Sequence, residues 1–289
     1  MPDVASTTLF DQPLKSLLSD AQFDLIRSIA RRHAGIVIAD HKRSMILRRL
    51  RRRLKALAID SVGDYCALLA GPAGPRELQP LINALTTNKT GFFREAHHFD
   101  HLRDVALPQL LAAKSLSGNR RLRIWSAGCS TGEEPWSIAL TVLCAIARPH
   151  DWDIQILATD IDTEVLATAK RGLYEKSDLA PVSGALRNSH FKKCADQGDF
   201  YEASTQLRSL MSFQPLNLHD AWPVRGPIDV IFCRNVVIYF DKPAQRVLYD
   251  RFANVLAQES FLYCGHSESL YGVSNRFESI GRSIHKRIA

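Results

Sequence analysis

The sequence predicts an α/β fold with a mostly parallel sheet, preceded by a small all-α domain. Strands alternate with helices after Thr86, and this alternation is typical of a parallel sheet with helices on both faces. Before Thr86 the apolar residues recur at helical spacing, and no strand pattern interrupts them. The length of 289 residues and the hydrophobic content of 46% allow one large core or two modest ones, so we expect two domains, at 14–88 and 89–289.

The N-terminal helices are predicted from capping residues and breakers. A capping serine and the stop at Gly35 bracket the first amphipathic stretch, which places a helix over Ser19–His33. Further stretches with helical spacing follow, the last of them after the breaker "GPAGP". They cover Asp40–Ile59, Ser61–Leu69 and Arg76–Leu85.

The second domain is predicted from apolar strand segments that alternate with helices. The strands are "RLRIW", "DIQILATD", "IDVIFCR" and "SFLYCGH", and helices begin at Glu134, Thr163 and Pro243. The closing segments "RFESI" and "SIHKRI" are expected to pair antiparallel at the sheet edge. The polar stretch at about 172–213 is too long for a simple connection, so we interpret it as an insertion.

Composition argues against several classes of protein. No apolar run is long enough to span a bilayer, and the N-terminus lacks the basic segment, apolar core and cleavage site of a secretion signal. We therefore expect a cytoplasmic protein without direct membrane insertion. The six cysteines are scattered without C-x-x-C pairs, which predicts reduced thiols and no structural metal.

The segment "IWSAGCSTGEEPWSIAL" follows the first predicted strand, at the end of the sheet where ligands bind in open α/β folds. It fits neither G-x-G-x-x-G nor the P-loop, and Glu133 and Glu134 at the helix start would repel a phosphate. A nucleoside that carries positive charge fits better, and S-adenosylmethionine offers a sulfonium and an ammonium without a phosphate. Taken alone, the two glutamates are equally consistent with acids that only favour the helix dipole.

Two further strand ends carry polar residues. Asp160 ends the second strand at the position where doubly wound folds place an acid on ribose hydroxyls, and Asp162 is expected to cap the next helix. Arg234 and Asn235 abruptly follow the apolar run of "FCRNVVIYF". A structural explanation for polar residues there is weak, so we interpret them as functional.

Six short segments, spread over most of the chain, carry a family resemblance. They are "LTTNKTGFFREAHHF", "SAGCSTGEEPWSIA", "ATDIDTEVL", "PLNL", "IFCRNVVIYF" and "GHSES". In this order they resemble the signature segments of the CheR family of chemotaxis receptor methyltransferases. The resemblance implies a Rossmann-like methyltransferase domain that transfers a methyl group from S-adenosylmethionine to chemoreceptor glutamates and releases S-adenosylhomocysteine. In some members the region near Cys194 to Tyr201 adds a small sheet that docks a receptor peptide, so we expect an inserted small β-subdomain.

The resemblance also assigns site residues by motif. It implies a cofactor pocket lined by Asn88, Thr90, Arg94, Glu134, Asp160, Asn217, Leu218, Arg234 and Asn235. Arg94 and Tyr239 would lie nearest the transferred methyl, where Arg94 could orient the incoming carboxylate and Tyr239 could contact the methyl region or the carboxylate. The alternative for Tyr239 is an aromatic side chain that packs beside Phe240.

A basic run lies on the second predicted helix. At helical spacing Leu47, Leu50, Leu54 and Leu57 share one side, and the opposite side carries Arg48, Arg51, Arg52 and Lys55. A charge run is most often a solvated helix face, but this cluster also suits an acidic partner. We therefore expect it to contact the cytoplasmic helical bundle of a methyl-accepting chemoreceptor, with the enzyme acting as a monomer.

Two other functions stay open at this point. The basic helix would allow a nucleic-acid methyltransferase, although no recognisable RNA- or DNA-binding module is present in the sequence. A regulatory module that binds S-adenosylmethionine or S-adenosylhomocysteine without turnover is the other, and intact Arg94 and Tyr239 argue against it. We expect a protein-glutamate O-methyltransferase of chemotaxis signal transduction, without a nucleic-acid partner.

Overall fold

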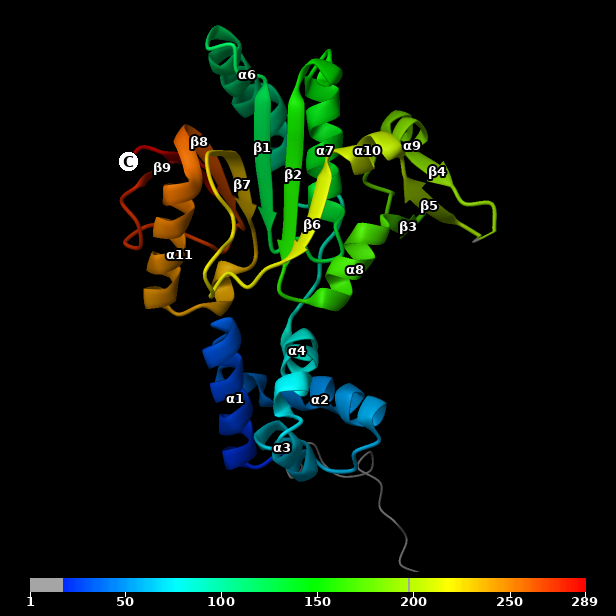
Figure 1. Cartoon of the computed structure of the whole chain (residues 1–289), viewed down its shortest axis with the longest axis vertical. Helices are drawn as coiled ribbons and strands as arrows, with labels where there is room; N and C mark the ends of the chain where they lie inside the picture. The colour runs from blue at the N-terminus through cyan, green and yellow to red at the C-terminus, as the bar shows by residue number, and fades with distance from the viewer. Residues whose placement is uncertain (1–17, 197) are drawn as a thin grey trace, which may run out of the picture. The chain divides into compact units, whose positions relative to one another are not determined.

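The computed structural model describes residues 18–196 and 198–289, which form two compact units (Figure 1). The helical unit contains the described residues up to Thr87 together with Tyr239–Asp241, and the α/β unit contains Asn88–Ile238 and Lys242–Ala289. The expected N-terminal boundary at residue 14 lies outside the described residues. The domain limits 14–88 and 89–289 are kept as a proposal.

Helices in the helical unit begin and end close to the predicted positions. Their bounds are Asp20–Ala34 (α1), Asp40–Lys42 (η1, a 3-10 turn), Arg43–Leu57 (α2), Val62–Ala70 (α3) and Gly74–Leu85 (α4). Ser19 caps α1 through a capping box with Gln22, and Gly35 ends it with φ of 67°. The stretch predicted as one helix over Asp40–Ile59 is a 3-10 turn followed by α2, because the hydrophobic spacing does not distinguish the two in a first turn. The buried leucines of α2 join the core of this unit.

The α/β unit is built on a seven-stranded sheet in the order β6-β2-β1-β7-β8-β10-β9. The strands are Arg121–Ala127 (β1), Asp153–Asp160 (β2), Met211–Pro215 (β6), Ile228–Cys233 (β7), Leu256–Cys264 (β8), Phe277–Gly281 (β9) and Ile284–Arg287 (β10). The pairs from β6 to β8 are parallel, and β10 pairs antiparallel with β8 and β9. The predicted parallel sheet and its antiparallel edge are confirmed.

Helices cover both faces of this sheet. The helical segments of this part of the chain are His97–His101 (α5), Leu102–Ala106 (η2, a π-helical turn), Leu107–Leu116 (α6), Glu133–Ala145 (α7), Pro149–Asp151 (η3), Thr163–Arg171 (α8), Thr205–Ser209 (α10), Val237–Tyr239 (η4) and Lys242–Val255 (α11). Ile124 of β1 packs in the core with α7, while the next residue, Trp125, packs on Phe252 of α11 with ring centroids 5.5 Å apart. The two-residue repeat of the strand therefore supplies a core on each side.

The insertion forms its own small antiparallel sheet, visible beside the main sheet in Figure 1. Its strands are Leu173–Glu175 (β3), Phe191–Lys193 (β4) and Phe200–Ala203 (β5), in the order β3-β5-β4, with the short helix Gly184–His190 (α9) between β3 and β4. The predicted small β-subdomain is thus present. The expected range of 172–213 overlaps β6, because Met211 already pairs with Ile156 of the main sheet.

The strand order places a switch point beside β1. The sheet continues from β1 to β2 on one side and to β7 on the other, so the loops after β1 and β7 diverge to opposite faces. Such a point is where open α/β sheets bind ligands, beyond the carboxyl ends of the strands. Within the described residues, no helix has both the length and the apolar character that crossing a membrane requires.

Candidate functional site

The loop after β1 turns sharply at Gly128 and leads into α7. Gly128 has φ of 93°, and a Cβ there would lie 2.3 Å from Cγ2 of Val236, so no side chain fits between the loops after β1 and β7. The N–H groups of Gly128 and Cys129 both donate to the Thr159 carbonyl, at 2.8 and 2.9 Å. The loop is thereby fixed against β2, and it delivers Glu134 to the first turn of α7.

A buried arginine is shared by two carboxylates at the switch point. Nη1 of Arg234 lies 3.0 Å from Oε2 of Glu134, and Nη2 lies 3.2 Å from Oε2 of Glu95. Ser126 donates its hydroxyl to Oε1 of Glu134 at 2.7 Å, and the Arg94 carbonyl accepts a further bond from Nη2 of Arg234. We call Glu95, Glu134 and Arg234 the arginine cluster. Since one guanidinium faces two carboxylates, the cluster has an excess of negative charge when both are ionised.

The two carboxylates of the arginine cluster have opposite pKa shifts. Burial raises the pKa of Glu134, and the charge of Arg234 offsets only part of that effect. Burial acts in the same direction on Glu95, but the hydrogen bond with His266 and the charge of Arg234 outweigh it and lower its pKa. Nδ1 of His266 lies 3.0 Å from Oε1 of Glu95. Glu134 is therefore the carboxylate of the cluster that is harder to ionise.

Asp160 lies at the end of β2 with its carboxylate bonded to two backbone groups. The N–H of Ser130 donates to Oδ2 at 2.8 Å, and the N–H of Asp162 donates to Oδ1 at 2.9 Å. Burial raises the pKa of Asp160 to about 6, although these bonds oppose the rise. Asp162 caps α8 by accepting from the N–H groups of Glu164 and Val165, as predicted.

The segment before α5, which contains Asn88, Thr90 and Arg94, connects the loop that follows Asp160 with the arginine cluster. Asn88 donates its amide to Oδ2 of Asp162 at 2.7 Å, and its carbonyl accepts from the Ser130 hydroxyl at 2.9 Å. Thr90 follows, half-buried, on the same segment. Arg94 donates Nη1 to the Lys89 carbonyl at 2.7 Å, which folds its side chain back over the segment.

Arg94 is flanked by two residues with left-handed backbone. Phe93 has φ of 52° and Glu95 has φ of 60°, conformations that cost free energy for residues other than glycine. The N–H of Phe93 donates to the Ser137 hydroxyl of α7 at 2.9 Å, which helps to hold this backbone in place. Strained backbone of this kind is concentrated at functional sites. It therefore indicates that the segment around Arg94 is functional, without assigning a role to the side chain.

Asn217 and Leu218 reach the site through the loop after β6. The N–H of Leu216 donates to the Asp160 carbonyl at 2.9 Å, which places the following residues beside the end of β2. The Asn217 side chain accepts from the N–H of His219 at 3.0 Å and so shapes the turn, and Leu218 is buried. The structure therefore brings this loop to the Asp160 end of the site.

Asn235 and Tyr239 follow β7. Asn235 directly follows Arg234 and has φ of 59°. Tyr239 ends η4 and is grouped with the helical unit, where its carbonyl accepts from the N–H of Val37 at 2.8 Å. The catalytic role of Tyr239 therefore remains a prediction.

Sequence reasoning missed several residues that organise this site. Glu95 stands beside Arg94 in "FFREA", and His266 and Glu268 stand in "GHSES", a segment that entered only as part of the resemblance. Ser126 in β1 donates to Glu134, and Ser130 in the loop after β1 donates to the backbone carbonyl of Asn88. An acid four residues beyond the apolar run "SFLYC" is the signal that could have marked Glu268.

The predicted basic residues lie on α2 in the helical unit. Arg48, Arg52 and Lys55 are exposed, whereas Arg51 is half-buried. Leu47, Leu50 and Leu54 on the other side of α2 are buried in the core and Leu57 packs against it partly buried, which confirms the amphipathic pattern. What the exposed cations contact remains a prediction.

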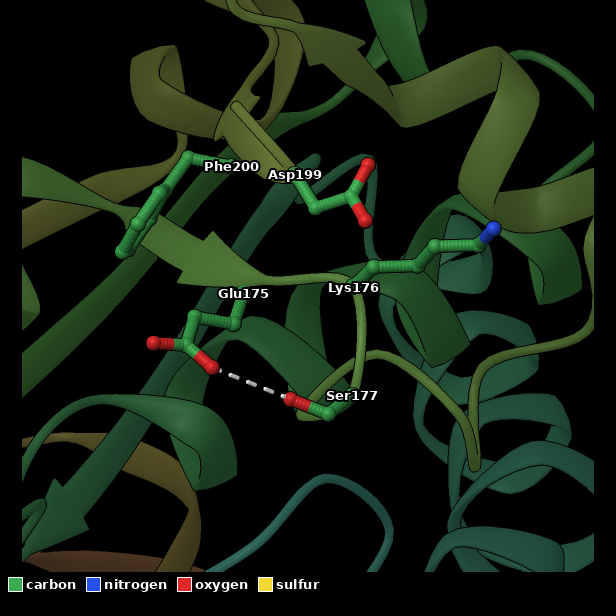
Figure 2. Close-up of a pocket in the computed structure, with 5 residues that line it drawn as sticks. All are labelled: Glu175, Lys176, Ser177, Asp199 and Phe200. Carbon is green, nitrogen blue, oxygen red and sulfur yellow. Dashed lines mark hydrogen bonds between the residues drawn. The ribbon is translucent and has the colours of Figure 1, made fainter. Parts of the chain in front are cut away.

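A cavity of about 500 Å³ lies in the inserted sheet, away from the predicted site residues. Its lining is Glu175, Lys176, Ser177, Asp199 and Phe200 (Figure 2). The Ser177 hydroxyl donates to Glu175 at 3.3 Å, and the Lys176 ammonium points away from that carboxylate. Glu134, Asp160 and Arg234, by contrast, lie at or just beyond the carboxyl ends of β1, β2 and β7.

The residues at the switch point fit S-adenosylmethionine. The excess negative charge of the arginine cluster suits a ligand with a sulfonium and an ammonium, and carboxylate oxygens such as those of Asp160 accept from ribose hydroxyls. Within the described part of the chain, Nε of Arg234 is also buried without a hydrogen-bond partner, which leaves a donor for an additional acceptor. Among the same residues, no group of three or more His, Cys, Asp or Glu is arranged to hold a metal ion.

Family models and related proteins all indicate the same family for this chain. The family description "CheR methyltransferase, SAM binding domain" matches residues 88–285, and "CheR methyltransferase, all-alpha domain" matches residues 21–86. The chain is 44% identical over 255 residues to a probable chemotaxis protein methyltransferase of Rhizobium etli, covering 88% of this chain and 94% of the relative. It is 38% identical over 288 residues to the chemotaxis protein methyltransferase of Salmonella typhimurium, covering 99% and 96%. The chain therefore belongs to the CheR family of chemotaxis protein methyltransferases, with an all-α domain followed by an S-adenosylmethionine-binding domain.

Proposed function

We propose that this protein transfers a methyl group from S-adenosylmethionine to glutamate side-chain carboxylates of chemoreceptors, giving glutamate methyl esters and S-adenosylhomocysteine. The observation that carries the proposal is the arginine cluster, in which two carboxylates share one buried guanidinium at the switch point of the sheet. A site with excess negative charge favours a cationic methyl donor over a phosphate-bearing cofactor. Family membership supports the same cofactor.

The proposed cofactor site has two ends. At one end Asp160 accepts from ribose hydroxyls, and Asn88, Thr90, Asn217 and Leu218 complete the walls. At the other end Glu134, Arg234, Asn235 and Arg94 hold the amino acid portion. When bound, S-adenosylmethionine supplies a methyl group on a positively charged sulfur. The short bonds among Asn88, Ser130 and Asp162 support this arrangement, because they fix the loops of one end before any ligand arrives.

The accepting carboxylate needs no general base. A glutamate side chain is already ionised near neutral pH, so catalysis can rest on alignment and on the exclusion of water. Arg94 orients the incoming carboxylate through a charge-assisted hydrogen bond once its side chain leaves the Lys89 carbonyl. Tyr239 contacts the methyl region or the carboxylate with its hydroxyl.

The partner proposed for the exposed cations of α2 is the cytoplasmic helical bundle of a receptor. Arg48, Arg52 and Lys55 are exposed and lie on the side of α2 that the core leaves open. Complementary charge mainly accelerates encounter and selects partners. The enzyme would act as a cytoplasmic monomer on its receptor.

Incubation with radiolabelled S-adenosylmethionine and receptor-bearing membranes tests the proposal. Carboxyl methyl esters release labelled methanol in alkali, whereas methylated bases and amines retain the label. We expect alkali-labile label on the receptor with the wild-type protein. Arg94→Ala should reduce turnover by more than cofactor affinity, and Arg225→Ala, at an exposed arginine, is the matched control.

Two outcomes would contradict the proposal. Alkali-stable label on nucleic acid would point to a nucleic-acid methyltransferase. Tight cofactor binding without transfer to any receptor carboxylate would point to a regulatory module. Equal losses of rate and affinity in Arg94→Ala would restrict Arg94 to cofactor binding.

A further inference from the structure

One buried carboxylate, that of Glu268, joins the loops after β7 and β8. Its Oε1 accepts from the N–H groups of Val236, Val237 and Ile238, at 2.9, 2.7 and 3.3 Å. Its Oε2 accepts from the N–H groups of Asn235 and Gly265, at 2.9 and 2.6 Å. Glu268 is 7% exposed, so these contacts lie out of bulk water.

The two loops belong together because their strands are neighbours. Cys233 at the end of β7 is paired in register with Cys264 at the end of β8, and the loops continue from these residues. A Cβ on Gly265 would lie 2.5 Å from Nδ2 and 2.8 Å from the backbone N of Asn235. The chain at Gly265 therefore passes too close to Asn235 for any larger residue, and Glu268 bonds to both backbones at this close approach.

The loop after β7 is held from two other sides. Val236 lies against Gly128, where no side chain would fit. Gln245 of α11 donates its amide to the Val237 carbonyl at 3.1 Å. The segment from Asn235 to Ile238 therefore has its donors fixed by Glu268, one carbonyl fixed by α11 and one side chain packed on the loop after β1.

We infer that Glu268 is a positioning residue for methyl transfer, an inference that rests on the proposed function. By holding the left-handed Asn235 and the next N–H groups, it sets where Asn235 lies and how Arg234 enters the arginine cluster. Its own oxygens are occupied by backbone donors, so it acts through Arg234 and Asn235. A carboxylate suits this task because both of its oxygens accept.

An amide of the same shape cannot perform this task. A glutamine at this position would present one oxygen and one NH2 group to five N–H donors, so at least one of the two loops would lose its acceptor. The test is therefore Glu268→Gln, and the matched control is Glu278→Gln on the exposed side of β9. Affinity for S-adenosylmethionine is measured by calorimetry well below the unfolding temperature of each variant, and kcat and KM are measured with receptor membranes.

We expect Glu268→Gln to bind the cofactor at least about tenfold more weakly and to lower kcat as well, with the control within about twofold of wild type. In wild-type protein, the amide hydrogens of Asn235 to Ile238 should exchange slowly and resonate downfield, as donors to a carboxylate do. In Glu268→Gln both signatures should disappear either for Asn235 or for Val236 to Ile238, because the one remaining oxygen can replace only Oε2 or Oε1. If that variant does not fold, Glu268→Asp, which keeps the charge and shortens the reach, takes its place in the same measurements.

Two results would overturn the inference. A lower unfolding temperature with unchanged cofactor affinity and kcat would make Glu268 a purely structural residue. Fast exchange of the Asn235 to Ile238 amides in wild type would show that the carboxylate does not hold the loop in solution. If wild-type protein bound no S-adenosylmethionine, the proposed function would fail and this inference with it. If wild type and Glu268→Gln bound the cofactor equally and had the same kcat, only this inference would fail.

Discussion

In each unit of the protein a buried glutamate pairs with an arginine, and the two arrangements differ in charge balance. In the helical unit Arg53 donates Nε and Nη2 to the two oxygens of Glu77, at 2.5 and 2.6 Å, and the Tyr65 hydroxyl donates to Oε1 at 2.8 Å. One guanidinium meets one carboxylate in the paired geometry that such groups prefer. In the arginine cluster of the α/β unit, Arg234 divides its donors between two carboxylates.

This difference indicates which pair serves stability and which serves a ligand. The Glu77 carboxylate has a donor on each oxygen, and its charge is matched by that of one guanidinium. The arginine cluster has excess negative charge when both of its carboxylates are ionised, and within the described residues Nε of Arg234 has no hydrogen-bond partner. A buried charge that is not balanced locally costs free energy, and a cationic ligand lowers that cost.

The largest effect is expected from Arg234→Met, which tests the proposed difference between the two units. The substitution leaves Glu95 and Glu134 buried without their shared cation, which should cost about 3–5 kcal/mol of stability. It should also weaken S-adenosylmethionine binding by about 100-fold, because the proposed amino acid end of the site loses its organising group. Calorimetric unfolding and titration measure the two effects. An affinity within about threefold of wild type would place the cofactor elsewhere.

Glu77→Gln is the counterpart in the helical unit. It replaces a buried carboxylate that accepts from Arg53 and Tyr65 by an amide, and the expected cost is about 1–3 kcal/mol in the unfolding free energy. Cofactor affinity should not change, because the residues assigned to the cofactor lie in the α/β unit. A weakened affinity in the folded variant would contradict the division of roles between the two ion pairs.

Lowering the pH should destabilise the α/β unit through two buried histidines. Burial lowers the pKa of His285 and of His98 from the ordinary 6.5 to about 4, so the folded α/β unit keeps both imidazoles neutral. In the unfolded chain the two histidines bind protons near pH 6.5. The contribution of the neutral histidines to the unfolding free energy is therefore fully present above about pH 7 and is lost as the pH falls toward 4. Between pH 7 and 5 we expect a loss of about 1–2 kcal/mol for each of the two histidines.

His285→Gln should make this pH dependence shallower, since it removes one of the protonation sites. The control is His41→Gln, at an exposed histidine of the helical unit. Unfolding free energies across the pH range measure the slopes. The same slope in His285→Gln as in wild type would show that this histidine is not the group that titrates.

The smallest effect is expected from the exposed cations of α2. Reversing Arg48, Arg52 and Lys55 to glutamate should weaken apparent receptor affinity by about three- to tenfold at low salt, since contacts across a wet interface act mainly on encounter. Cofactor affinity should stay the same, and raising the salt should narrow the difference from wild type. Normal methylation of receptors by the variant at low salt would leave these side chains as a solvated face.

The candidate site was only partly predictable from sequence. Strand ends identified Glu134, Asp160, Arg234 and Asn235, and the resemblance added Asn88 and Arg94. No local pattern could show that Arg234 pairs with Glu134, 100 residues away, or that Glu95 shares the same guanidinium. The strand β6 was missed because it is short and mostly exposed, and its place in the sheet depends on pairing with β2.

The sequence by itself determined the order of helices and strands, the parallel sheet and the family, because periodicity and caps are encoded between near neighbours and signature segments are read directly. The tertiary structure alone decided which charges are balanced and which are not. That outcome depends on distances between loops that follow different strands, as with Glu268 and the loop after β7. Such distances are set when the strands pair, since pairing brings residues far apart in the chain to the same edge of the sheet.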